Sequence, residues 1–567
     1  MIQNLYTTEG FELDQDKARI PWEIHPRPLM QRDSYLNLCG WWNFSVYIDD
    51  RTLFEPRKIR VPFPPESILS GVGEHFPEGA TLIYNREVSL PKDFRKETLL
   101  LHIDAADQHA EVYVDDKKYA AHSGGYEHFT VDISDVPESF VITIRVKDDL
   151  RDLSEPYGKQ KVKRGGMWYT PFSGLWQPVW LESVPAEYIS HLTIRTDMEK
   201  AWISTENDRH NGKITLHTPF GDEIYELKEG KAVLSPANRR NWTPDDPFLY
   251  HFELTLTGGD RIQSYFALRQ VEIRTINNIP RICLNGEPFF FNGLLDQGYY
   301  SDGLSTPADP MCYETDIQTA KDLGFNTLRK HIKVEPDVFY AACDRMGIIV
   351  FQDMVNNGSY SFVRDTVLPN IGLVKMSETA FQPGNTTQET FIERCKSTVS
   401  QLFSFPSIVY WTIFNEGWGQ FDSALLYQII RKSDPDRVID ATSGWYDTGA
   451  GDVQSIHKYN GKYTFEPSSR PVILSEFGGF ACRVPEHVYN PSRTYGYGTM
   501  KDCALLEQRI KRVYREEILP AIDKGLCGCI YTQLSDVEDE INGLLTWDRK
   551  ERKILENLLP SNRMETC

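Results

Sequence analysis

Two glutamates stand at the ends of strongly apolar segments in the C-terminal half of the chain. Glu416 closes the run "IVYWTIFNE" (residues 408–416), and Glu476 closes "PVILSE" (residues 471–476). Continuous β-branched and aromatic runs are typical of strands buried on both faces. Two carboxylates facing each other across a sugar ring would suit glycoside hydrolysis, in which one protonates the leaving oxygen and the other attacks the sugar or activates water. For either glutamate alone, the alternative is a surface or helix-capping residue.

Both segments belong to an alternation of strand and helix that starts near residue 280. The strand candidates are "FFFNGLL", "NTLRKH", "GIIVFQDM", "SIVYWTIFN", "RVIDAT", "DVQSIHKY", "PVILSEF" and "GCIYTQLSD". Between them, stretches such as "ETDIQTAKDLG" and "PDVFYAACDRMG" repeat apolar residues every three or four positions, as helices do. This pattern predicts a (β/α)8 TIM barrel over residues 278–567, with its chemistry at the carboxyl ends of the strands.

Polar residues gather at those predicted strand ends. They are Asp296, Arg329, His331, Asp353, Asn415, Glu416, His457, Tyr459, Glu476, Gln533 and Asp536. Arg329 and His331 are two residues apart, so they share one face of their strand. For these two side chains, an internal salt bridge of the barrel is an alternative to contact with a substrate.

Residues 1–277 have a different sequence pattern, without the alternation of strand and helix. Short alternating runs such as "WWNFSVYI" and "FVITIRVKD", separated by turn signals, predict a β-sandwich over residues 1–185. Further strand-like runs predict a second, smaller, immunoglobulin-like sandwich over residues 186–277. Its turn-rich segment "SPANRRNWTPDDP" contains prolines that cannot sit in a central ladder. The chain is therefore expected to be multidomain.

The composition favours an enzyme that acts on small molecules. A net charge of −20 repels phosphate backbones and anionic membranes, so neither nucleic acid nor membrane is an expected partner. The N-terminus shows no secretory signal, and no apolar run reaches the roughly 18 residues of a membrane span, so a cytoplasmic location is expected. The ten cysteines lack the spacing of a zinc or redox motif, which predicts reduced core residues.

Two motifs link the chain to a known family. "PSIVYWTIFNEGWGQ" and "PVILSEFGG" resemble the acid/base and nucleophile strands of glycoside hydrolase family two, which contains β-galactosidases, β-glucuronidases and β-mannosidases. "FNTLRKHIKVEPDVFYAACDRMGIIVFQDM" resembles its second and third barrel strands. "SYLNLCGWWNFSVY", "RVPFPPES", "YNREVSLP" and "GMWYTPFSGLWQPVWLE" resemble its sugar-binding jelly-roll domain. The resemblance implies a jelly roll over residues 1–185.

The resemblance also implies roles for single residues. Glu416 would be the general acid/base, and Glu476 the nucleophile that forms a covalent glycosyl-enzyme with retention of configuration. Asn415 would bind the 2-hydroxyl of the sugar, and Tyr459 would orient the nucleophile; a barrel-rim aromatic is the alternative for Tyr459. The further substrate-binding candidates are Arg329, His331, Asp296, His457, Gln533 and Trp168.

Departures from the family pattern bear on metal and substrate. No histidine follows the Asn-Glu pair in "NEGWG", so neither a catalytic metal nor another cofactor is expected. Gly166 stands where large β-galactosidases carry an Asp, and "DVEDEINGLLTWDRK" lacks the Asn-x-Lys pattern of many β-glucuronidases.

Three functions stay open at this point. A neutral β-galactoside ranks first as the substrate, a β-glucuronide or β-galacturonide second, and a non-catalytic carbohydrate-binding protein last. The partner would be a small-molecule or oligosaccharide glycoside, and homo-oligomer formation is left open. A uronide would need a cation close to its carboxylate. Basic residues on loops that could reach the pocket are Lys330, Lys458, Arg483 and Arg493, for which a solvated surface position is the alternative.

Overall fold

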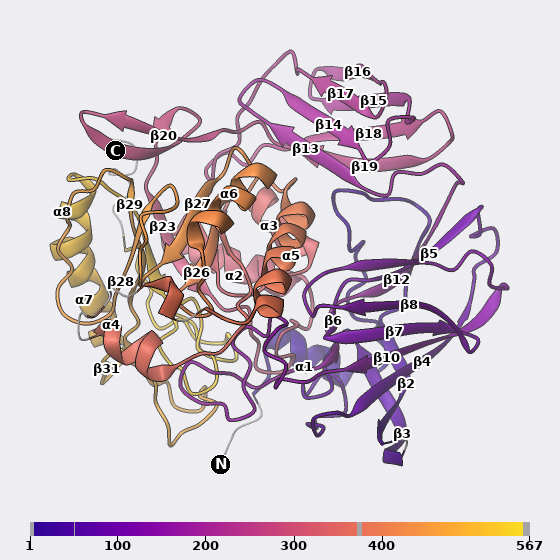
Figure 1. Cartoon of the computed structure of the whole chain (residues 1–567), viewed down its shortest axis with the longest axis horizontal. Coiled ribbons are helices and arrows are strands. Elements are labelled where there is room, and N and C mark those ends of the chain that lie inside the picture. The colour runs from indigo at the N-terminus through magenta and orange to yellow at the C-terminus, as the bar shows by residue number, and fades with distance from the viewer. Residues whose placement is uncertain (1–4, 50, 371–372, 374–376, 381, 559–567) are drawn as a thin grey trace.

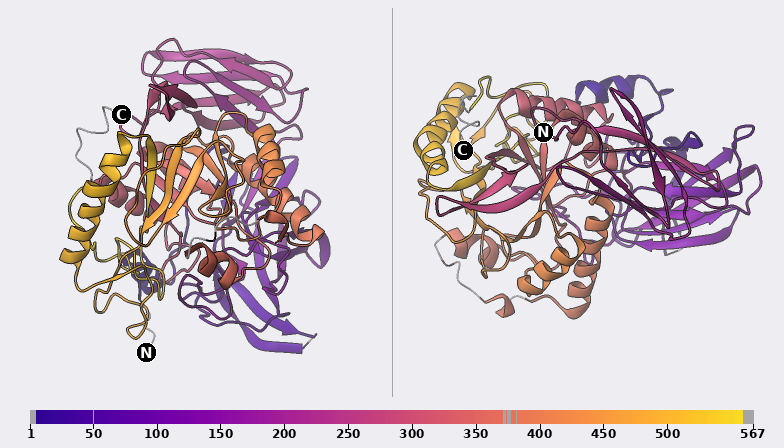
Figure 2. Two further views of the ribbon diagram at one scale, coloured as in Figure 1. Left: turned by 60° about the vertical axis from the view of Figure 1, so that its left-hand side comes forward. Right: turned by 90° about the horizontal axis from the view of Figure 1, so that it is seen from above.

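The computed structural model describes residues 5–49, 51–370, 373, 377–380 and 382–558. Figure 1 shows three regions: N-terminal strands in indigo and purple, a second group of strands in magenta, and a barrel in orange and yellow. Figure 2 shows the second sandwich at one end of the barrel and the N-terminal sandwich beside it. The predicted multidomain architecture, with two β-sandwich regions and a TIM barrel, is confirmed.

The N-terminal region follows helix α1 (Thr8–Gln15) and consists of antiparallel sheets. Alternation explains them: in β10, Phe140, Ile142, Ile144 and Val146 are buried and the residues between them are not. One sheet has the order β1 (Tyr35–Asn37), β12 (Val179–Val184), β5 (Thr98–Ile103), β9 (Phe129–Asp132). The second has the order β3 (Arg51–Val61), β2 (Gly40–Ile48), β4 (Thr81–Ser89), β10 (Ser139–Lys147), β7 (His109–Val114), β8 (Lys117–Ser123), and β6 (Ala106–Asp107) pairs with β11 (Gly174–Leu175).

The second region contains two further antiparallel sheets and a small hairpin sheet. The two sheets have the orders β13 (Leu192–Thr196), β14 (Ala201–Thr205), β17 (Lys231–Leu234) and β16 (Gly221–Leu227), β15 (Gly212–Thr218), β18 (Tyr250–Leu256), β19 (Arg261–Phe266). The hairpin sheet consists of β20 (Val271–Ile276), β21 (Ile279–Leu284) and β22 (Glu287–Pro288). The boundary proposed from the sequence at residue 277 falls in the turn between β20 and β21.

Eight parallel strands form the barrel, and each of the strand candidates after residue 280 contributes one. Their order in the sheet is β27 (Val438–Ser443), β26 (Ile408–Asn415), β25 (Ile349–Asp353), β24 (Thr327–Lys330), β23 (Phe291–Asp296), β32 (Leu526–Thr532), β29 (Val472–Gly478), β28 (Gln454–Lys458). The barrel is nearly closed: the side-chain oxygens of Ser443 on β27 and Ser455 on β28 lie 3.2 Å apart across the remaining seam.

Helices and short strands complete the barrel region. The helices are α2 (Met311–Asp322), α3 (Asp337–Met346), α4 (Leu368–Asn370), α5 (Asn385–Leu402), α6 (Ser423–Ser433), α7 (Cys503–Val513) and α8 (Leu519–Ile522), with single turns at Val363–Val367, Glu378–Ala380 and Tyr514–Ile518 and a short pair β30 (Ala481–Cys482) and β31 (Thr499–Met500). None of the described helices combines the length and apolar character that a membrane span requires. The nine described cysteines are free, and Cys567 lies outside the described residues.

A buried arginine joins the two sandwiches. Arg32 donates from Nη1 to Glu182 Oε2 at 2.9 Å on β12, and from Nη2 to Asp260 Oδ2 at 2.8 Å just before β19. Its Nη2 also donates to the carbonyl of Ile189 at 2.7 Å, in the linker between the regions. Burial by itself raises the pKa of Glu182, but hydrogen bonds and charge from His102 and Arg32 lower it to about 2. These contacts tie the two sandwiches through one guanidinium.

We expect Arg32→Met to lower the free energy of unfolding by about 3–5 kcal/mol, because it leaves two buried carboxylates without their cation. Since the folded state lowers the pKa of Glu182, its contribution to stability is present above pH about 4.5, its ordinary value, and is lost as the pH falls towards about 2. Urea unfolding at several pH values measures both effects. The control Arg151→Met removes an exposed ion pair with Asp149 and should leave the urea midpoint nearly unchanged.

Candidate active site

The two glutamates lie together at the carboxyl ends of β26 and β29. One side-chain donor atom of each of Glu416, His457 and Glu476 lies within 4.8 Å of the others. Glu416 directly follows β26 with a φ of 54°, a left-handed conformation that residues with a side chain rarely adopt and that occurs at functional sites. Its backbone N–H donates to the carbonyl of Ser443 at 2.8 Å, which holds this unusual turn in place.

Arg329 lies beneath the glutamates and is only 1% exposed. Its Nε donates to Asp353 Oδ1 at 2.9 Å, and its Nη1 donates to Glu476 Oε1 at 3.0 Å and to the carbonyl of Ser475 at 3.1 Å. Its Nη2 donates to Asn415 Oδ1 at 2.9 Å. The residue therefore forms an internal salt-bridge network that includes the nucleophile candidate and reaches three strands besides its own.

The groups around Glu476 stabilise its ionised form. Burial alone would raise the pKa of Glu476, but the positive charges of His457 and Arg329 and the hydrogen bond from Tyr459 hold it well below its ordinary value. Burial also acts against the charge of Arg329, yet Asp353 and Glu476 raise the pKa of its guanidinium. The structure thus places a carboxylate here that stays negative throughout the neutral pH range.

Tyr459 and His457 connect the two glutamates. The Tyr459 hydroxyl donates to Glu476 Oε2 and lies 3.5 Å from Glu416 Oε1. The ring of Tyr497 stacks on that of Tyr459, with centroids 3.8 Å apart and planes 9° from parallel, which limits the movement of the phenol. His457 Nδ1 lies 2.8 Å from Glu416 Oε1, and its Nε2 lies 3.0 Å from Ser443 Oγ.

Of the other predicted residues, His331 contacts Asp353, a partner of Arg329, and Asp296 forms an ion pair with Lys330. His331 Nδ1 lies 2.7 Å from Asp353 Oδ2, so it supports the carboxylate that holds Arg329. Burial lowers the pKa of His331, although the hydrogen bond to Asp353 acts in the opposite direction. Asp296 Oδ2 accepts from Lys330 Nζ at 2.6 Å, and Lys330 also donates to Glu335 Oε1 at 2.8 Å. Lys330 is thus neutralised by carboxylates.

Gln533 belongs to a separate chain of hydrogen bonds after β32. Its Nε2 donates to Asn542 Oδ1 at 2.9 Å, and its Oε1 accepts from Gln297 Nε2 at 2.9 Å. Asn542 Nδ2 in turn donates to Glu540 Oε1 at 3.0 Å. These hydrogen bonds run from Gln533 through Asn542 to Glu540, which faces the N-terminal region.

A loop of the N-terminal region reaches this part of the barrel. Tyr169 donates from its hydroxyl to Glu540 Oε2 at 2.6 Å. Trp168 packs edge-on against Trp418 and Tyr360, with ring centroids 5.2 Å and 4.9 Å away. Because Trp418 lies two residues after Glu416, Trp168 is close to the acid/base candidate through this aromatic cluster.

The remaining basic candidates do not contact the two glutamates. Arg493 is 67% exposed in its side chain and lies 3.6 Å from Asp539. Arg483 is exposed and donates to the carbonyl of Pro491 and the hydroxyl of Thr494. On β28 the buried His457 points into the barrel, so the next residue, Lys458, faces the opposite side of the strand. We find no direct contact between these three residues and the glutamates within the described chain.

The same three side chains, Glu416, His457 and Glu476, offer donor atoms that could hold a metal ion. The hydrogen bonds of Glu476 do not require a metal ion. Glu476 Oε1 already accepts from Arg329 and its Oε2 from Tyr459, so each oxygen has a donor from the protein.

Sequence reasoning missed several supporting residues. Ser443, Ser475 and Tyr497 carry no motif, and only the fold brings them to the glutamates. The signal that could have found Ser443 is its position at the end of the fifth barrel strand, where polar residues are informative.

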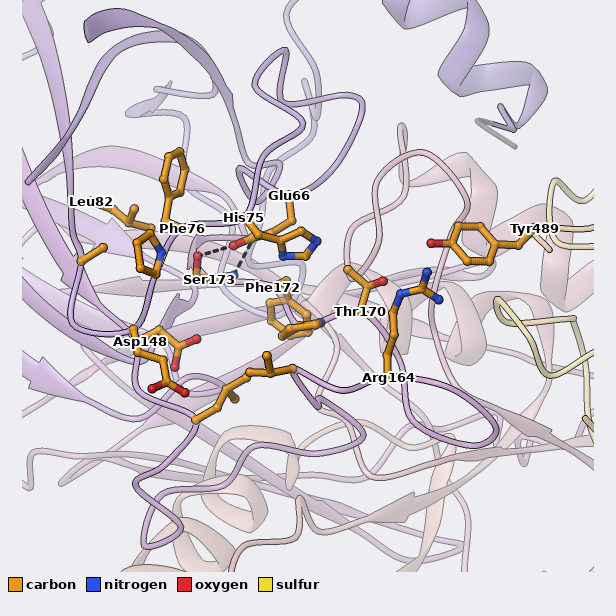
Figure 3. A pocket seen from close by; sticks show the side chains of 16 residues that line it. Glu66, His75, Phe76, Leu82, Asp148, Arg164, Thr170, Phe172, Ser173 and Tyr489 are labelled. Carbon is orange, nitrogen blue, oxygen red and sulfur yellow. Dashed lines mark hydrogen bonds between the residues drawn. The ribbon is translucent and has the colours of Figure 1, made fainter. Parts of the chain in front are cut away.

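A separate cavity lies between the N-terminal sandwich and the loop that follows β29 (Figure 3). It has a volume of about 480 Å³ and includes Glu66, Phe76 and Phe172 among its lining residues. Figure 3 shows Arg164, Thr170 and Tyr489 together at one end. Burial raises the pKa of Glu66 to about 8. None of its described lining residues is a predicted site residue, so this cavity is distinct from the glutamate pair.

Comparison with known proteins is consistent with this geometry. Residues 275–479 match the family model for the TIM barrel domain of glycosyl hydrolases family 2. A putative β-glucuronidase of Formosa agariphila is 24% identical over 462 residues, which are 72% of this chain and 51%, about half, of that protein. A β-glucuronidase of Paenibacillus borealis is 23% identical over 526 residues, covering 81% of this chain and 85% of that protein.

Two further comparisons bear on sugar and fold. A β-galactosidase of Aeromonas hydrophila is 30% identical over 253 residues, covering 42% of this chain and 22% of that protein. The structure of a β-D-glucuronidase from Dictyoglomus thermophilum superposes with a TM-score of 0.74 at 19% identity, covering 93% of this chain and 96% of the other. At this identity the superposition establishes a shared fold.

We expect Arg329→Met to lower kcat/KM by at least about 100-fold, because it removes the cation and the anchor of Glu476. Without the guanidinium the pKa of Glu476 rises. In the role that the family resemblance implies for it, Glu476 is a nucleophile and must be ionised. Activity should then be lost as the pH falls through that pKa, and the acidic limb of the pH profile of kcat/KM should move to higher pH. A lower rate with an unmoved acidic limb would mean that Arg329 supports only the fold.

Proposed function

We propose, from the membership of this chain in glycoside hydrolase family 2, that it is a retaining, exo-acting β-glycosidase that cleaves terminal β-linked sugars. The observation that carries the proposal is the short distance between the glutamates, with one oxygen of Glu416 within 4.8 Å of one of Glu476. Retaining enzymes hold their carboxyl groups about 5–5.5 Å apart, whereas inverting enzymes need about 6.5–9.5 Å to admit a water.

In the first step, Glu476 attacks the anomeric carbon while Glu416 gives its proton to the leaving oxygen. The bond from the anomeric carbon to that oxygen breaks, and a bond to a Glu476 oxygen forms. Arg329 and Tyr459 each donate to Glu476, so they keep the attacking group ionised and aligned. In the second step, Glu416 takes a proton from water, which attacks the same carbon and releases Glu476.

Asn415 is placed to assist both steps. Its Oδ1 accepts from Arg329, which leaves its Nδ2 as the donor that a sugar hydroxyl could meet. We assign this donor to the 2-hydroxyl, a contact that strengthens as positive charge develops on the ring. Trp168, with Trp418 and Tyr360, offers an aromatic wall on the side of Glu416.

For the sugar, we place a β-uronide above the β-galactoside that the sequence analysis ranked first. The relative named β-glucuronidase from Paenibacillus borealis matches 81% of this chain, whereas the relative named β-galactosidase matches 42%. A match to most of the chain includes the N-terminal loops at the barrel mouth as well as the barrel. The third alternative, a non-catalytic binding protein, has no need of two glutamates at this spacing.

The two glutamates should respond differently to removal. Glu476→Ala should lower kcat on p-nitrophenyl glycosides by on the order of 10⁴-fold or more, because no covalent intermediate can form. Glu416→Ala should still release p-nitrophenol, a leaving group that needs no proton, and added azide should raise its rate by attacking the intermediate. Steady-state kinetics with and without azide measures this.

Product stereochemistry gives the matching control. Proton NMR of the wild-type reaction should show the β-anomer of the sugar first, before mutarotation. A first product of α-configuration, or full activity in Glu476→Ala, would rule out the retaining mechanism.

A further inference from the structure

A short segment of the N-terminal region crosses the mouth of the barrel. The backbone N–H of Tyr157 donates to the carbonyl of Asn356 at 3.2 Å, and its hydroxyl donates to the carbonyl of Gly358 at 2.7 Å. A Cβ on Gly158 would lie 3.2 Å from the carbonyl oxygen of Ile332. The segment therefore passes directly over the chain that leaves β24 and β25, beside His331 and Asp353.

The next three residues form "KQK", and their side chains have different surroundings. Gln160 is committed to the sandwich: its Nε2 donates to Asp107 Oδ2 at 2.9 Å, and its Oε1 accepts from the Phe172 N–H at 2.8 Å. Lys161 places its Nζ 4.0 Å from the ring centroid of Trp168, a cation–π contact. The ammonium group of Lys159 makes no such hydrogen bond and no such cation–π contact with the described residues.

Lys159 differs from the other buried lysines of the described chain. Four lysines are buried there: Lys159, Lys330, Lys333 and Lys553. The last three lie 2.6–2.9 Å from a carboxylate oxygen of Asp296, Glu335 or Asp536. Lys159 is 8% exposed, and its ammonium group has no ion pair or hydrogen bond within the part of the chain that the structure describes. Because its side chain is largely buried and its ammonium group has no ion pair or hydrogen bond with the described residues, Lys159 can donate to an anion from outside the protein.

Two neighbours, Glu540 and His331, place the charge of Lys159 at the mouth of the barrel. Burial raises the pKa of Glu540 and lowers that of His331, and the positive charge of Lys159 pulls both pKa values down. Tyr169, whose N–H donates to the Lys159 carbonyl at 3.0 Å, also donates to Glu540. His331 supports Asp353, which holds Arg329. Lys159 is thus between the end of β24 and the loop after β32, on the rim around the glutamate pair.

We propose that Lys159 binds the carboxylate of the sugar whose glycosidic bond is cleaved at Glu416 and Glu476, which makes the substrate a β-linked uronide. The inference rests on the proposed function of this site and adds its specificity-determining residue. Lys330, Arg483 and Arg493 do not fit this role, because each is already bound to protein groups or exposed at the surface. The cation comes from the N-terminal region, so specificity would be set by a different domain from the one that supplies the glutamates.

The test compares matched substrates that differ only in charge: p-nitrophenyl β-glucuronide with β-glucoside, and β-galacturonide with β-galactoside. The wild type should show a higher kcat/KM for one uronide than for its neutral counterpart. Lys159→Met should raise KM for that uronide by at least about tenfold, because one charge-assisted hydrogen bond is lost, and should change KM for the neutral glycoside by less than about threefold. Lys159→Arg should recover part of the lost affinity.

The exposed Lys163, four residues further along the same loop, gives the matched control, and Lys163→Met should leave both KM values unchanged. Should Lys159→Met fold poorly, the wild type alone still tests the proposal: KM for the uronide should rise with ionic strength and that for the neutral glycoside should not.

The outcomes separate the two claims. Equal effects of Lys159→Met on charged and neutral substrates, or a wild type that prefers the neutral sugar, would overturn the inference and leave the proposed function standing. Preference for a 6-sulfated galactoside over both uronides would overturn the carboxylate assignment. No hydrolysis of any of these β-glycosides by the wild type would instead overturn the proposed function itself.

Discussion

A buried guanidinium organises the carboxyl end of the barrel. Arg329 donates to Asp353 on β25, to Asn415 on β26 and to Glu476 and the Ser475 carbonyl on β29. A charge at this depth is tolerated only when its hydrogen bonds are satisfied, so the ends of four strands must stay in register around it. The same requirement places Glu476 at a defined position and keeps it ionised. The arrangement of these strand ends and the ionisation of Glu476 therefore depend on one side chain.

The barrel alone does not complete the site. The N-terminal sandwich contributes Trp168 to the aromatic cluster beside Glu416, and Tyr169 and Arg164 donate to Glu540 and Glu538 after β32. The buried core is continuous across this junction, since aromatic residues of both regions pack in a single cluster. Loops that vary on this rim can change the sugar that is accepted without disturbing the chemistry beneath it.

Much of the barrel could be predicted from the sequence because buried parallel strands leave a strong local signal. Every residue of β26 and β29 is buried, and each strand begins with a run of apolar residues. The predicted fold class is confirmed, and this strong local signal is why it could be predicted. Glu416 and Glu476 stood out because each breaks such a run, although their catalytic roles stay predictions.

The positions of other residues could not be predicted, because they depend on partners far away in the chain. Asp296 and Gln533 also end strands, yet Asp296 binds Lys330 and Gln533 binds Asn542. Nothing in the segment "KQK" indicates that Lys159 is buried with no ion pair or hydrogen bond at its ammonium group in the described part of the chain. That property arises only when residues near positions 159, 331 and 540 meet in the folded protein, and local propensity contains no information on such contacts.

The central claim is that Glu476 becomes covalently bonded to the sugar. Treatment with 2-deoxy-2-fluoro-β-glycosyl fluorides of the glucuronyl and galactosyl series, followed by mass spectrometry of the intact protein and its peptides, tests this claim most directly. The account predicts time-dependent inactivation with a single sugar attached to the peptide "PVILSEFGG", on Glu476. Inactivation with the label on Glu416 or on any other residue would contradict it.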